Sequence, residues 1–191
     1  MEASIQNVVA AAQSGDERAA NRLISEFYPR IYAFVRRLAG SDQDAEDLTQ
    51  QTFTRVWKSL RNYSGASSVS SWMHGIAHHV YVDWRRADRR GEPQTDEWWQ
   101  TQVAPEPGPA EVAAIAEVAR GLYAAVDRLQ PEVRITIHLH YYQGLTLKDT
   151  ADALGVATST VKYRLRAALD ELQSSFDRVQ SPSSKLQSHR S

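Results

Sequence analysis

The sequence predicts an all-α protein made of two small helical domains joined by a flexible linker. Apolar residues recur every three to four positions through both halves of the chain, which is the period of an amphipathic helix. Residues 91–110 contain four prolines and no such period, which is typical of a linker. The predicted division is residues 1–90, the linker 91–110, residues 111–178, and a polar, disordered tail at 179–191.

Composition excludes several classes of protein. Of the 191 residues, 42% are apolar and 24% charged, so the chain can form a hydrophobic core. The absence of cysteine excludes disulfides, thiolate metal sites and cysteine nucleophiles, and it fits a reducing cytoplasm. The N-terminus is unlike a signal peptide, and no apolar run reaches the roughly 20 residues of a membrane span. A cytoplasmic protein without direct membrane insertion is therefore predicted.

The net charge of −1 hides an uneven distribution. Residues 1–90 carry 12 bases and 10 acids, and residues 120–191 carry 10 bases and 7 acids. Between them, residues 91–119 hold six acids and no base. Phosphate contacts supply most of non-specific DNA affinity, so a chain this balanced should bind naked DNA weakly. A partner that presents the chain to DNA is therefore expected.

Two helices are predicted before residue 40. The first ends at Ser14-Gly15, and Asp16 can cap the second. The apolar stripe of the second helix comprises Leu23, Phe27, Ile31, Phe34 and Leu38. Because Pro29 lies inside this pattern, a kink or short break is expected near Tyr28.

A third helix is predicted from Ser41-Asp42 to Leu60, and a fourth after the turn-forming loop RNYSGASS. The predicted buried face of the third helix comprises Leu48, Phe53, Val56, Trp57 and Leu60. Ser70 or Ser71 is expected to cap the fourth helix. Its predicted stripe comprises Trp72, Ile76, Val80 and Trp84.

The second half begins with a predicted helix over residues 112–129, and Pro131 suits the first turn of another. Apolar and polar residues then alternate over 133–142, which is a strand pattern. Since a lone strand cannot satisfy its backbone groups, a helix ending at Gly144 is predicted instead. In the linker, the paired Trp98 and Trp99 are expected to dock on another surface.

Residues 146–169, TLKDTADALGVATSTVKYRLRAAL, are typical of a helix-turn-helix. Ala151 allows two helices to cross closely, Gly155 permits the corner, and Val156 and Val161 fill the space beneath it. Thr150 stands where a larger aliphatic residue is usual. The second helix would meet phosphates at its start and bases in the major groove. The predicted DNA-binding residues are Thr158, Ser159, Thr160, Lys162, Tyr163, Arg164 and Arg166. The alternative is a helical hairpin with a solvated basic face.

The segments DAEDLTQQTFTRVWKSL at 44–60 and YSGASSVSSWMHGIAHHVYVDWRRADRR at 63–90 closely resemble extracytoplasmic-function sigma factors, compact bacterial initiation factors that keep the second and fourth sigma domains. LQPEVR, YYQGLTLKDTADALGV and TVKYRL in the second half resemble the fourth domain. The resemblance spans about residues 5–176, with the variable linker between the two blocks.

This resemblance implies that the helix from Asp42 to Leu60 docks on the β′ clamp of core RNA polymerase, with the β flap as a further contact of the factor. The implied polymerase-binding residues are Asp44, Glu46, Asp47, Leu48, Gln51, Phe53 and Trp57. The alternative is the solvated acidic start of a core helix, and core packing is the expected individual role of Phe53 and Trp57.

The resemblance also implies promoter contacts. The loop 63–68 and the helix after it would capture an unstacked base and the strand of the −10 element, and the helix-turn-helix would recognise the −35 element. The implied −10 residues are Tyr63, Gly65, Ser67, Ser68, His79, Arg85, Arg86, Arg89 and Arg90. Many relatives have Asn at the position of His79 and a further base at that of Ala168, so the base preference and one DNA contact are expected to differ here. Trp72, Ile76 and Trp84 are expected in the core.

Family members are usually restrained by an anti-sigma protein, often membrane-anchored, and such a partner is expected for a stress-response factor of this kind. Two alternative classes of protein share features with this sequence. His74, His78 and His79 have spacings that can hold zinc, but no cysteine or carboxylate pair completes a site. A stand-alone helix-turn-helix regulator would bind duplex DNA without polymerase. No catalytic constellation, cofactor or metal is predicted, so the chain is not expected to be an enzyme.

Overall fold

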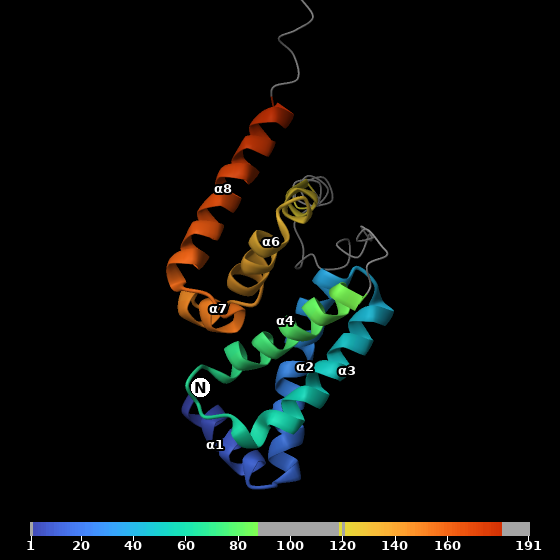
Figure 1. The fold of residues 1–191 in the computed structure, drawn as a ribbon, viewed down its shortest axis with the longest axis vertical. Helices are drawn as coiled ribbons and strands as arrows, with labels where there is room; N and C mark the ends of the chain where they lie inside the picture. The colour runs from blue at the N-terminus through green and yellow to red at the C-terminus, as the bar shows by residue number, and fades with distance from the viewer. Residues whose placement is uncertain (1, 88–118, 120, 181–191) are drawn as a thin grey trace, which may run out of the picture. The chain divides into compact units, whose positions relative to one another are not determined.

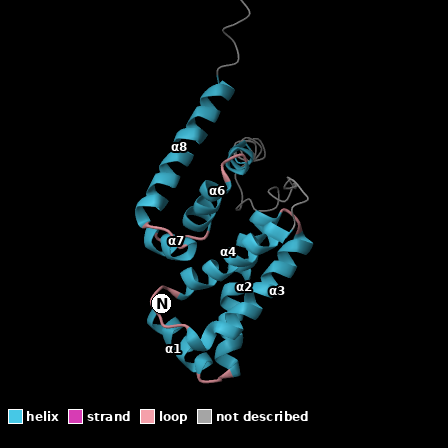
Figure 2. Ribbon diagram, viewed as in Figure 1, coloured by secondary structure: helices cyan, strands magenta, loops and turns pink. Residues whose placement is uncertain are grey.

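The structure is a computed structural model that describes residues 2–87, 119 and 121–180. Its elements are α1 (Glu2–Gln13), α2 (Glu17–Ala39), α3 (Asp42–Ser59), η1 (Leu60–Asn62), α4 (Val69–Ala87), α6 (Pro131–Ile137), η3 (His138–Tyr142), α7 (Leu147–Leu154) and α8 (Thr158–Gln180) (Figure 1). Within the described residues every regular element is a helix, and the connections are loops (Figure 2). This confirms the all-α prediction.

Contacts divide the chain into two compact units. One comprises Met1–Asp96 with His138–Val161, and the other Glu97–Ile137 with Lys162–Ser191. The segment from η3 to the start of α8 therefore packs with the N-terminal helices. This grouping differs from the predicted division at residues 91–110, whose boundaries stay a prediction.

Helix α2 carries the core of the first unit. Its predicted stripe is buried along its whole length, from Leu23 to Leu38. The stripe packs among α1, α3 and α4, which all contact α2. The prediction of a short break near Tyr28 is wrong, because α2 is one continuous helix of 23 residues that includes Pro29. A proline removes only one backbone donor, and the buried apolar face on both sides of Pro29 keeps the helix continuous.

Side-chain caps fix where the helices of this unit begin. The Asp16 carboxylate accepts hydrogen bonds from the backbone N–H groups of Arg18 and Ala19, as predicted for the start of α2. The Ser41 hydroxyl accepts one from the N–H of Asp44 at the start of α3. The predicted caps of α4 are wrong, since the helix begins at Val69 and Ser68 accepts from the N–H of Ser71 at 3.1 Å.

The buried face of α4 differs from the predicted stripe. Trp72, Ile76 and Trp84 are only half-buried. The buried apolar residues of α4 are Val69, Met73, Ala77, Val80 and Tyr81. The buried stripe therefore lies about one position further along the helix than the tryptophans suggested, and of the predicted stripe only Val80 belongs to it.

Residues 133–142 are helical, as predicted against their alternating pattern. Helix α6 ends at Ile137 and the π-helical turn η3 continues to Tyr142, and Gly144 follows with a φ of 69°. Every residue from Arg134 to Leu139 is buried. Polar and apolar side chains are buried alike here, so the alternation does not separate an inner face from an outer face.

The turn of the helix-turn-helix forms where the sequence predicted it. Gly155 ends α7 with a φ of 64°, and the N–H of Val156 donates to the carbonyl of Ala151 at 3.1 Å. Ala151 and Val161 are buried and α8 begins at Thr158.

Several predictions fall outside the described residues: the linker with Trp98 and Trp99, the bases Arg89 and Arg90, and the tail after residue 180. Helix α8 extends to Gln180, two residues into the predicted tail. Among the helices of residues 2–87 and 121–180, none has the length and apolar character needed to cross a membrane.

Candidate nucleic-acid and polymerase interfaces

The first turns of α8 present one exposed polar face. At 100° per residue, Ser159, Lys162, Tyr163 and Arg166 lie within one third of the helix circumference, and all four are exposed, Tyr163 to 73%. The buried face comprises Val161, Leu165 and Ala168. A cationic face with an exposed aromatic ring can meet phosphates and base edges in a major groove.

Other predicted residues of α8 lie off this face. Arg164 is half-buried and sits beside the buried side of the helix, as does Thr160. The N–H groups of Thr160 and Val161 donate to the carbonyl of Ala157, at 2.9 and 3.2 Å, which closes the first turn. Ala168, where many relatives carry a further base, lies on the buried side of α8 and is 1% exposed. The loss of a DNA contact at this position stays a prediction.

Thr150 lies in the core beneath the turn. Its side chain is fully buried, and within the described residues its hydroxyl has no hydrogen-bond partner. A buried, unpaired hydroxyl costs about 1–3 kcal/mol. At this position the core therefore contains an unpaired hydroxyl in place of the larger aliphatic side chain that is usual there.

The outer face of α3 is the second candidate surface. Glu46, Asp47, Gln51 and Trp57 are exposed and share one side of the helix. Trp57 is 54% exposed, so its predicted core role is wrong. Leu48 lies on the opposite side of α3 and is 1% exposed. It therefore packs in the core and anchors the helix that carries the exposed surface. An exposed tryptophan among acidic and amide side chains is typical of a protein interface.

Two further predicted residues of α3 have local partners. The carboxylate of Asp44 accepts a hydrogen bond from the Ser41 hydroxyl at 2.6 Å, which completes the N-terminal cap of the helix. The half-buried ring of Phe53 stacks on Tyr28 with centroids 5.7 Å apart. Both residues therefore shape α3 in addition to any contact with a partner.

The loop 63–68 is held closed by its own contacts. Gln13 donates to the carbonyls of Leu60 and Tyr63 at 2.9 and 2.8 Å, which anchors the loop to α1. The Tyr63 hydroxyl donates to the carbonyl of Ser67 at 2.5 Å, and its ring lies 4.7 Å from that of Trp72. Burial raises the pKa of Tyr63, so this hydroxyl stays a donor at neutral pH. Gly65 stands exposed at the tip with a φ of 76°.

The remaining predicted −10 residues lie along α4. His79, Arg85 and Arg86 are all exposed. Arg85 donates to the hydroxyl of Tyr81 at 3.1 Å, which fixes its direction. Asp83 lies between His79 and Arg86 on the same side of α4 and pairs with Arg55 of α3 at 2.9 Å. The positive charge of Arg55 partly compensates the negative charge that Asp83 would present to a nucleic-acid strand.

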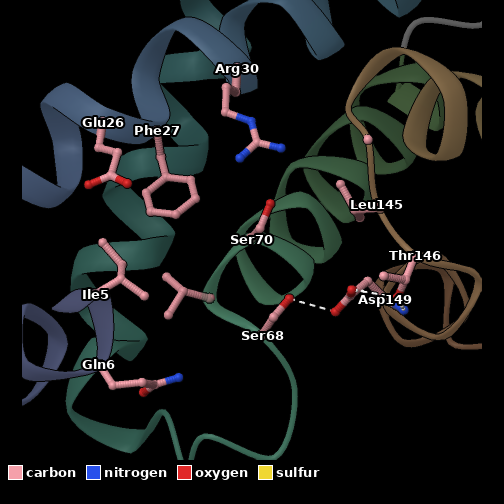
Figure 3. Close-up of a pocket in the computed structure, with 12 residues that line it drawn as sticks. Ile5, Gln6, Glu26, Phe27, Arg30, Ser68, Ser70, Leu145, Thr146 and Asp149 are labelled. Atoms are coloured by element: carbon pink, nitrogen blue, oxygen red, sulfur yellow. Dashed lines mark hydrogen bonds between the residues drawn. The ribbon is translucent and has the colours of Figure 1, made fainter. Parts of the chain in front are cut away.

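A cavity of about 300 Å³ lies where the start of α4 meets the segment before α7 (Figure 3). Ser68 is the predicted site residue in its lining, with Phe27 and Arg30 of α2 opposite. The Ser68 hydroxyl donates to the carboxylate of Asp149 at 2.6 Å. Sequence analysis missed this contact, because Ser68 and Asp149 are 81 residues apart.

The histidines considered for zinc have other surroundings. His74 is fully buried and its Nδ1 lies 2.7 Å from the carbonyl of Ser70, while His79 is exposed. In the part of the chain that the structure describes, no three His, Cys, Asp or Glu side chains are placed to hold a metal ion.

Both halves of the chain match models of known protein families. The family model for sigma-70 region 2 matches residues 23–91, and that for sigma-70 region 4 matches residues 119–172. The ECF RNA polymerase sigma factor SigE of Mycolicibacterium smegmatis is 33% identical over 167 residues, which are 86% of this chain. The chain spans 62% of the length of that relative. SigX of Bacillus subtilis is 30% identical over 155 residues, 79% of this chain and 80% of SigX.

Two solved structures share the fold. CnrH in complex with the cytosolic domain of CnrY has a TM-score of 0.65 at 22% identity, over 90% of this chain and 96% of CnrH. The sigma factor RpoE in complex with the anti-sigma factor NepR from Bartonella quintana has a TM-score of 0.59 at 22% identity, over 82% of this chain and 96% of RpoE. With both sigma-70 regions in order and 30% identity to a Bacillus subtilis factor over four fifths of its length, the chain belongs to the extracytoplasmic-function (ECF) sigma factors of the sigma-70 family.

Proposed function

We propose that this sigma factor binds core RNA polymerase and directs transcription initiation at specific promoters. Residues 1–90 serve the polymerase clamp and the −10 element, residues 111–178 serve the −35 element, and residues 91–110 connect them. The observation that carries the proposal is the presence of two chemically different exposed faces on one chain. One is the acidic and aromatic face of α3, and the other is the cationic face of α8.

On α3, Trp57 is the apolar anchor of the polymerase-binding surface and Glu46, Asp47 and Gln51 surround it. Large aromatic residues dominate the binding free energy of protein interfaces, while charges at the rim set specificity and association rate. The β′ clamp is the proposed partner, and the β flap receives the C-terminal part of the chain. The exposure of these four side chains in the free chain supports this role.

On α8, Lys162, Tyr163 and Arg166 contact the −35 element as duplex DNA. Ser159 and the N-terminal turn of the helix bind phosphate. For the −10 element, the closed loop 63–68 and the side of α4 with His79 and Arg86 receive the separated strand. A preformed loop supports this role, because it lowers the entropy cost of capturing an unstacked base.

Anti-sigma control and localisation form a further part of the proposal. A protein inhibitor covers the polymerase-binding surfaces until a stress signal releases the factor, and the factor acts in the cytoplasm beside polymerase. The name of one related structure, in which the sigma factor RpoE is in complex with the anti-sigma factor NepR, supports this part. The phosphodiester chemistry belongs to polymerase, and this chain performs no catalysis of its own.

In vitro transcription with purified core polymerase over a promoter library tests the proposal. The expected result is initiation at a defined subset of promoters that depends on this chain. A gel shift with and without core polymerase separates the proposal from a stand-alone regulator. Specific DNA retention is expected only with polymerase, and specific binding by the free chain at equal affinity would contradict the proposal.

A further inference from the structure

The last residue of α1 ties the loop 63–68 to the N-terminal helix. The side-chain amide of Gln13 donates to the backbone carbonyl of Leu60 at 2.9 Å and to that of Tyr63 at 2.8 Å. A primary amide has two N–H groups, so both donors of this nitrogen are used. The two carbonyls lie at the start of η1 and at the first residue of the loop. One side chain therefore fixes the direction in which the loop leaves η1.

Helix α1 gives this attachment a fixed starting point. The helix contacts both α2 and η1, and its buried apolar residues are Val8, Val9 and Ala12. The chain then turns at Gly15, which has a φ of 96°, and the N–H of Asp16 donates back to the carbonyl of Ala11 at 3.0 Å. Because the helix and the turn hold its backbone, Gln13 presents its half-buried amide to the loop from a defined position.

A second glutamine of α1 reaches the side chain of Tyr63. Gln6 precedes Gln13 by seven residues, which places it about two turns away on the same side of the helix. Burial raises the pKa of Tyr63, and a hydrogen bond from the Gln6 side chain to its hydroxyl acts in the opposite direction. The same hydroxyl donates to the carbonyl of Ser67 at 2.5 Å, and the centre of the ring lies 4.7 Å from that of Trp72. Tyr63 is therefore held at its backbone and at its side chain.

The loop depends on this attachment because it has no helix of its own. The residues from Tyr63 to Ser68, all of which the structure describes, lie outside the helices, and Gly65 at the tip is exposed. The N–H of Tyr63 donates to the carbonyl of Leu60 at 3.1 Å, the same carbonyl that accepts from Gln13. Loss of the Gln13 amide would leave the Tyr63 carbonyl without this donor, so the loop would sample a wider range of positions.

We infer that Gln13 is a positioning residue for −10 recognition, which holds Tyr63 and the loop 63–68 in the shape that selects the unstacked promoter base. The inference rests on the proposed function, since it assigns the loop to the separated strand. Gln13 lies before residue 23, where the match to sigma-70 region 2 begins, and it acts through Tyr63 without touching DNA. A loop held in advance lowers the entropy cost of capturing the base.

Gln13→Met tests the attachment in the free chain, because methionine is close to glutamine in size but donates no hydrogen bond. Hydrogen-exchange mass spectrometry should show several-fold faster exchange of residues 61–68 in this variant than in the wild type. Asn7→Met is the matched control, since it replaces an exposed amide on the same helix, and its exchange over 61–68 should match the wild type. Unchanged exchange in Gln13→Met would overturn the inference. This step needs no polymerase.

In vitro transcription with core polymerase tests the consequence. The templates are a promoter that the wild-type chain uses and versions of it in which each −10 and each −35 base is substituted in turn. In Gln13→Met the penalty for substitution at one −10 position should shrink about tenfold, while the −35 penalties stay the same. A merely structural role would lower transcription from every template by the same factor and leave all penalties unchanged, and that result would also overturn the inference.

Gln13→Lys is the rescue variant, because its ammonium group keeps N–H donors on a side chain one bond longer. It should restore both the slow exchange of residues 61–68 and the −10 penalties. An attraction of its charge for phosphate acts on every template alike, so it leaves the penalties unchanged. Equal loss of −10 discrimination in Gln13→Lys and Gln13→Met would contradict the role of the two hydrogen bonds.

The two steps separate failure of the inference from failure of the proposed function. If the wild-type chain directs no transcription with core polymerase, the proposed function fails and the inference fails with it. If the wild-type chain initiates at defined promoters but Gln13→Met retains its −10 penalties, the inference alone is overturned.

Discussion

His74 is a buried imidazole in the core of the first unit. Its ring is 0% exposed and meets the edge of Phe34 with centroids 5.5 Å apart. Burial lowers the pKa of His74 to about 4, although the hydrogen bond to the Ser70 carbonyl acts in the opposite direction. The folded protein therefore holds this side chain neutral at pH 7.

This burial predicts a loss of stability in mild acid. An unfolded chain protonates the same imidazole near pH 6.5, so between about pH 6.5 and 4 the unfolded state binds more protons than the folded state. The contribution of His74 to the free energy of unfolding should fall by about 2 kcal/mol from pH 7 to pH 5. Urea denaturation at both pH values measures it. His74→Gln should remove this part of the pH dependence, and His79→Gln, at an exposed position, should keep it.

The buried hydroxyl of Thr150 leads to a second prediction about a single residue. Thr150→Val replaces a buried hydroxyl that lacks a partner by a methyl group, so it should stabilise the fold by about 1 kcal/mol. Thr52 is the matched control, because it is equally buried but donates to the carbonyl of Leu48 at 2.7 Å. Thr52→Val should gain less stability, since it removes that bond. Equal effects of the two substitutions in thermal denaturation would contradict this account of Thr150.

At the level of elements, α3 separates a surface for recognition from a surface for folding. Trp57→Ala should leave the unfolding free energy nearly unchanged, because the ring is 54% exposed, but it should weaken binding to core polymerase about tenfold. Val56→Ala should do the reverse, since Val56 is 5% exposed and its truncation costs about 2 kcal/mol. Calorimetry and an equilibrium titration with core polymerase give the two quantities. A large stability loss in Trp57→Ala would place that ring in the core.

The exposure of the basic side chains of α8 predicts which of them contact DNA. Lys162 and Arg166 lie on the exposed face, whereas Arg164 is half-buried beside the hydrophobic face. Replacing Lys162 or Arg166 by Ala should lower the slope of log affinity against log salt by about one, the loss of one phosphate contact. Arg164→Ala should change the slope less. The measurement is promoter binding by the sigma–polymerase complex over a salt series, and equal slopes for all three variants would contradict the assignment.

For the whole molecule, the features that could be predicted from the sequence are those determined by local periodicity and short-range hydrogen bonds. The α2 stripe from Leu23 to Leu38, the cap at Asp16 and the corner at Gly155 are all confirmed, because spacing and short-range hydrogen bonds determine them. The stripe of α4 was misplaced by one position. Tryptophans mark an amphipathic helix without telling which side of their large rings is buried.

Contacts between distant segments could not be predicted in the same way. The pairing of Ser68 with Asp149 joins residues that local patterns assigned to two separate domains. Their side chains are ordinary helix-capping groups in sequence, and the packing of α7 on α4, which is close at Gly75 and Ala153, brings them together. The assignment of residues 133–142 as helix succeeded for a non-local reason, the lack of a partner strand for the alternating pattern.

Gly75 lends itself to evolutionary adjustment. Glycine and alanine codons differ by one nucleotide, so a point mutation can place a methyl group against the Ala153 carbonyl without altering any residue proposed to touch DNA or polymerase. A lineage could thereby loosen the packing of α7 on α4 while its regulon stays the same.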